Sequence, residues 1–222
     1  MTLDKNNPYK CFPFERSEDG RQFSPSAQRN AAPILEVLKS CLPSSGTILE
    51  VAAGSGEHSV MFAPEFSDNF WLATDPAEDK VGSIRAWHKV KSSPNLLAPM
   101  ALDSVAKTWP VEKLELPAPI TGMVCVNMIH VSPWKAGQGL LAAAGRILDL
   151  GGVLYLYGAF MMGGKHTAPS NVEFNAMLKK TDPDWGLRNL EDVEAEAGLN
   201  GLKLFKVVPM PANNFSVVFQ KI

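Results

Sequence analysis

The chain has 222 residues and a formal net charge of −2, and charged side chains make up 20% of it. This length fits one large α/β domain. Acidic and basic residues are mixed along the chain, without the basic block that nucleic acid or an anionic membrane attracts. The three cysteines are far apart and form no C-x-x-C pair, which is typical of a reducing compartment. We see no signal peptide and no run long enough to span a bilayer, so we expect a cytoplasmic location.

The chain divides into an arm and one domain. Residues 1–23 are polar and punctuated by prolines, and we expect an irregular arm there, ahead of a single domain over 24–222. Apolar spacing and turn residues predict the elements of that domain. In chain order they are a helix over 26–42, a strand over 47–52, a helix over 57–66, a strand over 70–74, a helix over 77–90, strands over 95–102 and 121–127, a helix over 133–150, a strand over 153–157, a glycine-rich irregular segment over 158–170, helices over 171–180 and 189–198, and a hairpin of 202–208 with 215–220.

The most informative segment is residues 48–58, Ile-Leu-Glu-Val-Ala-Ala-Gly-Ser-Gly-Glu-His. An apolar strand carries a carboxylate, Glu50, and is followed by Gly54 and Gly56 and then a helical pattern. Glycines let the backbone approach a ligand, and the helix start offers free N–H groups. An NAD-binding loop needs Gly or Ala three places after the second glycine, where this chain has Ser59. The pattern resembles motif I of class I S-adenosylmethionine (SAM) methyltransferases, whose acid faces the amino group of the cofactor.

The order of elements supports the same fold. Strands that alternate with helices imply right-handed βαβ units and a parallel sheet. A terminal hairpin then makes one strand antiparallel. We therefore predict an α/β, Rossmann-like three-layer sandwich whose seven-stranded, mostly parallel sheet has an antiparallel C-terminal strand, as in class I methyltransferases. A plain NAD-binding domain would not predict the hairpin.

Polar residues stand at the ends of successive predicted strands, where open α/β sheets bind ligands. Glu50 is costly to bury without a partner, and a cationic ammonium would compensate it. Asp75, ahead of Pro76, would accept from the two ribose hydroxyls of a bound cofactor, or would cap the next helix. Asp103 would accept a hydrogen bond from the amine of adenine, with Leu102 against the face of the adenine ring. Alternatively, Asp103 would cap another helix.

The loop after the fourth predicted strand, Asn127-Met128-Ile129-His130, lies where this fold puts residues beside the transferable methyl group. It lacks the Asn/Asp-Pro-Pro-aromatic motif of some amino-group methyltransferases. His130 would serve as a general base, because its unperturbed pKa is near neutrality, or as a structural residue. His58 would be a cap or a cofactor contact. The four histidines lack a metal-binding spacing, so we predict no metal.

The glycine-rich segment and the hairpin turn complete the candidate site. A long irregular segment in a compact domain is usually a functional lid or disordered. Phe160 would line an apolar acceptor pocket or belong to the core. Ser170 and Asn171 would contact the acceptor or cap the next helix, and Asn214 would contact it or shape the hairpin turn.

Over nearly its full length the chain resembles the methyltransferase-like protein 26 family. The resemblance is carried by the blocks Gln28-Arg29-Asn30, 50–58, Asp75-Pro76, 127–134, Tyr157-Gly158, Pro169-Ser170-Asn171, 182–186 and 210–214. Ala159 stands where we expect proline, and Asn175 where we expect an acid. Both departures fall near the acceptor side, so the resemblance implies SAM binding rather than a particular substrate. It also implies pocket roles for Arg29, Asn30, His130, Tyr157, Ser170 and Asn171.

We therefore predict a SAM-dependent methyltransferase that methylates a small molecule and releases S-adenosylhomocysteine (SAH). The alternatives are a SAM- or SAH-binding module without turnover and, disfavoured by Ser59, an NAD-dependent oxidoreductase. We expect neither nucleic acid nor a membrane as partner. The expected cofactor contacts are Arg29, Asn30, Glu50, Ala52, Gly54, Gly56, His58, Asp75, Pro76, Leu102, Asp103, Asn127 and Met128. The catalytic candidates are His130 and Tyr157, and the acceptor-binding candidates are Trp134, Phe160, Ser170, Asn171 and Asn214.

Overall fold

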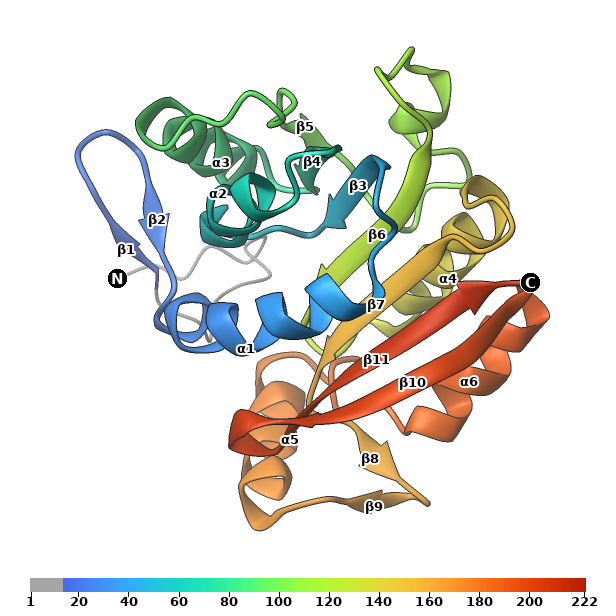
Figure 1. Ribbon diagram of the computed structural model, residues 1–222. Helices are drawn as coiled ribbons and strands as arrows, with labels where there is room; N and C mark the ends of the chain where they lie inside the picture. The colour runs from blue at the N-terminus through green and yellow to red at the C-terminus, as the bar shows by residue number, and fades with distance from the viewer. Residues whose placement is uncertain (1–13) are drawn as a thin grey trace.

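Seven strands form the central sheet of the computed structural model, which describes residues 14–222. They are β3 (Gly46–Val51), β4 (Asn69–Asp75), β5 (Met100–Ala101), β6 (Ile120–Val126), β7 (Val153–Gly158), β10 (Leu202–Met210) and β11 (Asn214–Lys221). Their spatial order is β10-β11-β7-β6-β3-β4-β5 (Figure 1). β11 runs antiparallel to both neighbours, and the pairs from β7 to β5 are parallel. This confirms the predicted mostly parallel sheet with a reversed final strand.

Helices cover both faces of the sheet (Figure 1). They are α1 (Pro25–Cys41), α2 (Glu57–Phe62), α3 (Glu78–Val90), α4 (Trp134–Ile147), α5 (Pro169–Thr181) and α6 (Leu190–Leu199). Side chains alternate across a strand, so Ile48 of β3 packs with α1 and Leu49 packs with α4 on the opposite face. Two apolar layers therefore enclose β3, and every residue of that strand is buried.

The third predicted strand, 95–102, is much shorter than expected. Only β5 joins the ladder, and Leu96 adds one isolated bridge to Trp71. Pro94 and Pro99 have no N–H to donate, so this edge segment cannot pair continuously.

Two predicted helices have different ends in the structure. The helix expected over 57–66 stops at Phe62 and continues as a 3₁₀ turn, η1 (Ala63–Glu65), because Pro64 cannot continue the hydrogen bonding. The helix expected from residue 77 begins at Glu78, with Ala77 as its N-cap residue. Asp75 lies inside β4, so the prediction that it caps this helix was wrong.

The glycine-rich segment expected to be irregular contains a small hairpin. Its strands are β8 (Met161–Met162) and β9 (Lys165–His166), joined by Gly163 and Gly164 with φ of 56° and 72°. Two successive positive φ angles match the twist of a two-residue hairpin turn, and glycine adopts them without steric cost.

The N-terminal arm is anchored on α3. Its first thirteen residues lie outside the described part, and the remainder forms a hairpin of β1 (Glu15–Arg16) and β2 (Gln22–Phe23) rather than an irregular segment. The Phe23 ring meets Trp87 edge-on at 5.1 Å, and the Trp87 indole N–H donates to the Gln22 carbonyl at 2.9 Å. Among residues 14–222, no helix has both the length and the apolarity needed to cross a bilayer.

Candidate active site

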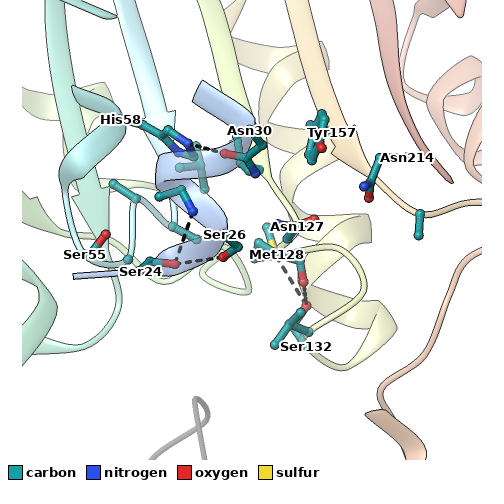
Figure 2. Close-up of a pocket in the computed structure, with 18 of the residues that line it drawn as sticks. Ser24, Ser26, Asn30, Ser55, His58, Asn127, Met128, Ser132, Tyr157 and Asn214 are labelled. Atoms are coloured by element: carbon teal, nitrogen blue, oxygen red, sulfur yellow. Dashed lines mark hydrogen bonds between the residues drawn. The ribbon is translucent and has the colours of Figure 1, made fainter. Parts of the chain in front are cut away.

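A cavity of about 1220 Å³ opens at the carboxyl ends of β3, β6 and β7. Strand order reverses beside β3, and open parallel sheets bind ligands at such a point. Figure 2 shows polar side chains from α1, α2, β7 and the β6–α4 loop facing this space. The predicted site residues that line it are Arg29, Asn30, Glu50, Ala52, Gly54, His58, Pro76, Leu102, Asp103, Asn127, Met128, Tyr157, Ser170, Asn171 and Asn214.

The glycine loop after β3 has two different glycines. Gly54 lines the cavity with φ of 60°, and a Cβ built on it would meet nothing within 4 Å. Gly56 does not line the cavity, which corrects its predicted role. A Cβ on Gly56 would lie 2.8 Å from Cα of Ile84, so this glycine lets α3 pack against the loop.

Backbone strain is concentrated around the cavity. Four non-glycine residues of the described chain have positive φ: Ala52 (57°), Asn127 (64°), Ala212 (56°) and Asn213 (58°). All four line the cavity. Such conformations cost about 1–3 kcal/mol each and persist where the surroundings impose them, often at functional sites. Their grouping here supports a functional interpretation of this cavity.

Glu50 is a carboxylate inside an apolar strand that nevertheless faces the cavity. It is 2% exposed, and its Oε2 accepts from the Trp71 indole N–H at 2.8 Å. Burial raises the pKa of Glu50 from 4.5 to about 7; the Trp71 hydrogen bond opposes that rise, and the neighbouring Asp75 adds to it. No cationic side chain of the described residues forms an ion pair with Glu50, so a cation bound in the cavity would stabilise its ionised form.

Asp75 supports the glycine loop and does not line the cavity. It is completely buried, and its Oδ2 and Oδ1 each accept a hydrogen bond at 3.0 Å, from the backbone N–H groups of Gly54 and Ala77. The predicted contact with ribose hydroxyls is therefore absent from this geometry. The sequence could not show it, because the carboxylate turns toward the glycine loop, which precedes it by 21 residues at Gly54.

Asp103 and Leu102 follow β5 and reach the cavity as predicted. Asp103 is exposed and its Oδ1 accepts from the Val105 N–H at 3.0 Å, which closes a turn. No helix begins there, so the alternative interpretation as a helix cap was wrong.

His58, Asn30 and Tyr157 join α2, α1 and β7 across the cavity wall (Figure 2). Nε2 of His58 lies 2.8 Å from Oδ1 of Asn30, and the Asn30 side chain also acts on Tyr157, whose pKa it lowers against the effect of burial. Burial lowers the pKa of His58 to about 4, against a weaker opposing bond to the Ala27 backbone. Burial raises the pKa of Tyr157, so at neutral pH this network consists of uncharged groups.

His130, the predicted base, does not line the cavity. It is completely buried, its Nδ1 accepts from the Arg188 N–H at 3.3 Å, and its ring meets Phe160 edge-on at 4.7 Å. A Cβ on Gly158 would lie 2.4 Å from the imidazole, so this glycine makes room for the ring. Burial, with the Arg188 charge as a second cause, lowers the pKa of His130 to about 3. The geometry therefore makes His130 a structural residue.

Two predicted acceptor contacts also lie away from the cavity. Phe160 is completely buried in the core beside His130. Trp134 begins α4 and packs against Gly137, with the Arg188 guanidinium 5.7 Å from its ring centre. The apolar lining comes instead from Pro133 and from Phe174 of α5, among others.

The start of α5 is joined to the β10–β11 turn at one end of the cavity. Nδ2 of Asn171 donates to the Asn213 carbonyl at 3.0 Å, and Nδ2 of Asn213 donates to the Ser170 hydroxyl at 3.0 Å. Nδ2 of Asn214 donates to two carbonyls of the turn, which confirms its predicted turn-shaping role. The N-cap residue of α5 is Ala168, so the alternative in which Ser170 or Asn171 caps this helix was wrong.

Sequence reasoning missed part of the wall. Ser24, Ser26, Ala27 and Pro33 bring the N-terminal half of α1 to the cavity, and Phe14 brings the arm. A Ser-Pro pair was the available signal, because serine caps helices and proline fits their first turn. Ser24 does cap α1, and its N–H donates to Oε2 of Glu57 at 2.5 Å, which ties α1 to the glycine loop.

The strand order and the cavity together define the class I methyltransferase fold, and solved structures share it. One is CalO1, a methyltransferase in calicheamicin biosynthesis in an SAH-bound form (TM-score 0.66, 18% identity, 89% of this chain and 55% of that chain). A second is the mitomycin 7-O-methyltransferase MmcR (TM-score 0.72, 10% identity, 90% of this chain and 55% of that chain). A third is an O-methyltransferase family 2 protein from Planctomyces limnophilus in complex with apigenin (TM-score 0.68, 17% identity, 89% of this chain and 60% of that chain). The chain spans little more than half the length of these proteins.

The chain belongs to the family described as protein of unknown function DUF938, whose model matches residues 21–221. The match covers nearly all of the described chain. The solved structures are less than 20% identical to this chain, so their likeness shows the fold alone.

Proposed function

We propose that this protein is a SAM-dependent methyltransferase that acts on a small molecule. Glu50 carries the proposal. It is a buried carboxylate that faces a cavity at the switch point of the sheet, and among residues 14–222 no cationic side chain forms an ion pair with it. SAM has an ammonium group and a sulfonium group, and either would compensate such a carboxylate. The anionic pyrophosphate of NAD would be repelled by it.

The cavity offers groups for each part of the cofactor. Glu50 would hold the ammonium group, and the loop at Gly54 lets the ligand approach the backbone. Leu102 would pack against the face of the adenine ring, and Asp103 would accept a hydrogen bond from its amine. Asp75 supports this half of the site by holding the loop. Bound SAM supplies an electrophilic methyl group, and the protein's task is then to align the acceptor with it and to exclude water.

Among the similar structures, the SAH-bound form of CalO1 supports the proposed cofactor, and the mitomycin 7-O-methyltransferase MmcR supports the proposed reaction type. The sequence resemblance to the methyltransferase-like protein 26 family supports the same activity for a single domain over residues 24–222. A cytoplasmic location remains part of the proposal.

Calorimetric titration of SAM tests the cofactor. We expect one SAM or SAH bound per chain, and no saturable binding of NAD. Asp103→Ala should bind SAM about tenfold more weakly, because a hydrogen bond to a charged group contributes about 1.5–3 kcal/mol. Asp68→Ala is the matched control, since Asp68 is exposed and does not line the cavity. Equal SAM affinity for the two variants would remove Asp103 from the site, and absence of SAM binding by the wild type would refute the proposal.

A second candidate function is SAM or SAH binding without turnover. The observation that favours it is the position of His130, which is buried behind the wall and unable to reach an acceptor. Incubation with SAM and a library of small molecules, followed by detection of SAH, separates the two functions. Binding of SAM without formation of SAH from any molecule of the library would favour a binding module without turnover.

A further inference from the structure

Charge is distributed unevenly around the cavity. The charged residues of the described lining are Arg29, Glu50 and Asp103, which come from α1, β3 and the turn after β5. The opposite half is built by the ends of β6 and β7, the start of α4, the start of α5 and the β10–β11 turn. None of these elements contributes a charged side chain to the lining.

We assign Arg29 to the first half, because the residues on either side of it in α1 contact that side of the cavity. Its neighbours along α1 bind the glycine-loop side of the cavity: Nε2 of Gln28 donates to Oε1 of Glu57 at 3.1 Å, and Asn30 bonds to His58. The cofactor, if SAM, occupies this half, which contains Glu50 and the glycine loop. The acceptor is left with the uncharged half.

An uncharged wall selects against charged acceptors. A carboxylate or phosphate placed there would lose its hydration without meeting a cation, and an ammonium would meet no carboxylate. The same wall has apolar surface from Val131, Pro133 and Phe174, against which a ring can pack. The wall therefore favours an acceptor whose buried part is uncharged.

The uncharged half also has no free general base among the described residues. His130 is sealed behind the wall, and Tyr157 is protonated at neutral pH. His58 reaches the cavity, but its Nε2 lies 2.8 Å from Oδ1 of Asn30, and burial lowers its pKa to about 4. An acceptor must therefore lose its proton to solvent, which an aliphatic alcohol does not do near neutral pH.

Two side-chain amide oxygens indicate that the acceptor carries hydrogen-bond donors. Asn171 and Asn214 use their amide nitrogens within the wall, and their carbonyl oxygens have no hydrogen bond in the described chain. Both residues line the cavity. Carbonyl oxygens accept and do not donate, so they favour a ligand with hydroxyl or N–H groups.

We propose that the acceptor is an uncharged aromatic molecule with a weakly acidic phenolic hydroxyl or thiol as the reacting group and further hydrogen-bond donors on the ring. This inference rests on the proposed methyltransferase function. The acceptor first loses its O–H or S–H proton to water. The oxygen or sulfur is now an anion, and the sulfonium cation beside it compensates its charge. Its lone pair then bonds to the methyl carbon while the bond from that carbon to the sulfonium sulfur breaks, leaving the electron pair on the sulfonium sulfur and producing SAH and the neutral methylated acceptor.

Binding of matched ligands to the SAH-saturated protein tests the charge preference directly. The probes are 2-naphthol, 6-hydroxy-2-naphthoate and 6-(aminomethyl)-2-naphthol, which share a ring system and differ in charge. We expect 2-naphthol to bind at least tenfold more tightly than either charged probe. The inference is overturned if a charged probe binds as tightly as 2-naphthol, or if none of the three binds while SAH does. Failure of SAH itself to bind would instead refute the cofactor proposal.

A positive charge introduced into the uncharged half should weaken this preference. Ser170 and Val172 are both exposed and lie two residues apart on α5, but only Ser170 lines the cavity. Ser170→Arg should improve the affinity for 6-hydroxy-2-naphthoate relative to 2-naphthol by about tenfold, and Val172→Arg should leave that ratio unchanged. Equal ratios in the two variants would place the acceptor elsewhere.

The pH dependence of turnover tests where the proton goes. With a series of phenols of different acidity, the midpoint of kcat/KM against pH should follow the pKa of each acceptor. A midpoint that stays constant across the series would show that a group on the protein takes the proton, and would overturn this part of the inference.

Discussion

Replacing Glu50 by glutamine should stabilise the unliganded protein and weaken SAM binding at the same time. The two side chains have nearly the same shape, and the glutamine carbonyl can still accept from the Trp71 indole N–H. What the variant loses is the buried negative charge. Most conservative core substitutions destabilise a protein, so a gain would identify the carboxylate as a group retained for binding.

The magnitude follows from the pKa of Glu50. Burial raises it from 4.5 to about 7, and each pH unit corresponds to about 1.4 kcal/mol, so the ionised carboxylate costs the folded state about 3 kcal/mol. Below pH 4.5 the group is protonated in both the folded and the unfolded chain, and the cost is absent. As pH rises from 4.5 to 7 the unfolded chain releases its proton first, so wild-type stability falls. The stabilising effect of Glu50→Gln should therefore grow over this window and remain constant above it.

Urea denaturation at pH 4.5 and pH 8 measures this effect, with Glu194→Gln as the matched control because Glu194 is exposed. Calorimetry at pH 8 should show SAM bound at least tenfold more weakly by Glu50→Gln, since a charge-assisted bond contributes about 1.5–3 kcal/mol. The reasoning fails if Glu50→Gln unfolds more easily than wild type at pH 8, or if it binds SAM with unchanged affinity.

Three further predictions concern the wall and the loop. Gly158→Ala should lower the free energy of unfolding in urea by about 1–3 kcal/mol, because the new methyl group would overlap the His130 ring; an unchanged value would show that the ring moves freely. Asp75→Asn should cost about 1–3 kcal/mol in the same assay and also weaken SAM binding, because an amide cannot accept from both N–H groups that the carboxylate serves, one of them on Gly54. Ala212→Gly should stabilise the protein by up to about 1 kcal/mol, because glycine adopts φ of 56° without strain, and a loss of stability would contradict that reason.

The fold could be predicted because its signals are local. Apolar strands alternating with helical spacing dictate βαβ units, and the handedness of those units leaves few arrangements of the sheet. The glycine loop and the C-terminal hairpin could then be read from turn residues. Prolines were the main source of error, since Pro64 follows the end of α2 and Pro99 interrupts the segment 95–102, although apolar spacing continues in both places.

The site was predictable in position and only partly in detail. Placing polar residues at the carboxyl ends of strands correctly selected Glu50, Asp103, Asn127 and Tyr157 as cavity residues, because strand ends of a parallel sheet meet at one edge. His130 lies only three residues after Asn127, but its ring is buried in the core. Closeness in the sequence does not show which way a side chain points.

The sequence by itself determined the order of strands and helices, the glycine loop and the group of side chains that meet at one edge of the sheet. Only the tertiary structure decided which of those side chains face the cavity. Asp75 turns to the glycine loop after β3, and His130 turns into the core, because each finds hydrogen-bond or packing partners there, supplied by segments distant in the sequence. The uncharged half of the cavity is a property of the same kind, since it is assembled from β6, β7, α5 and the β10–β11 turn.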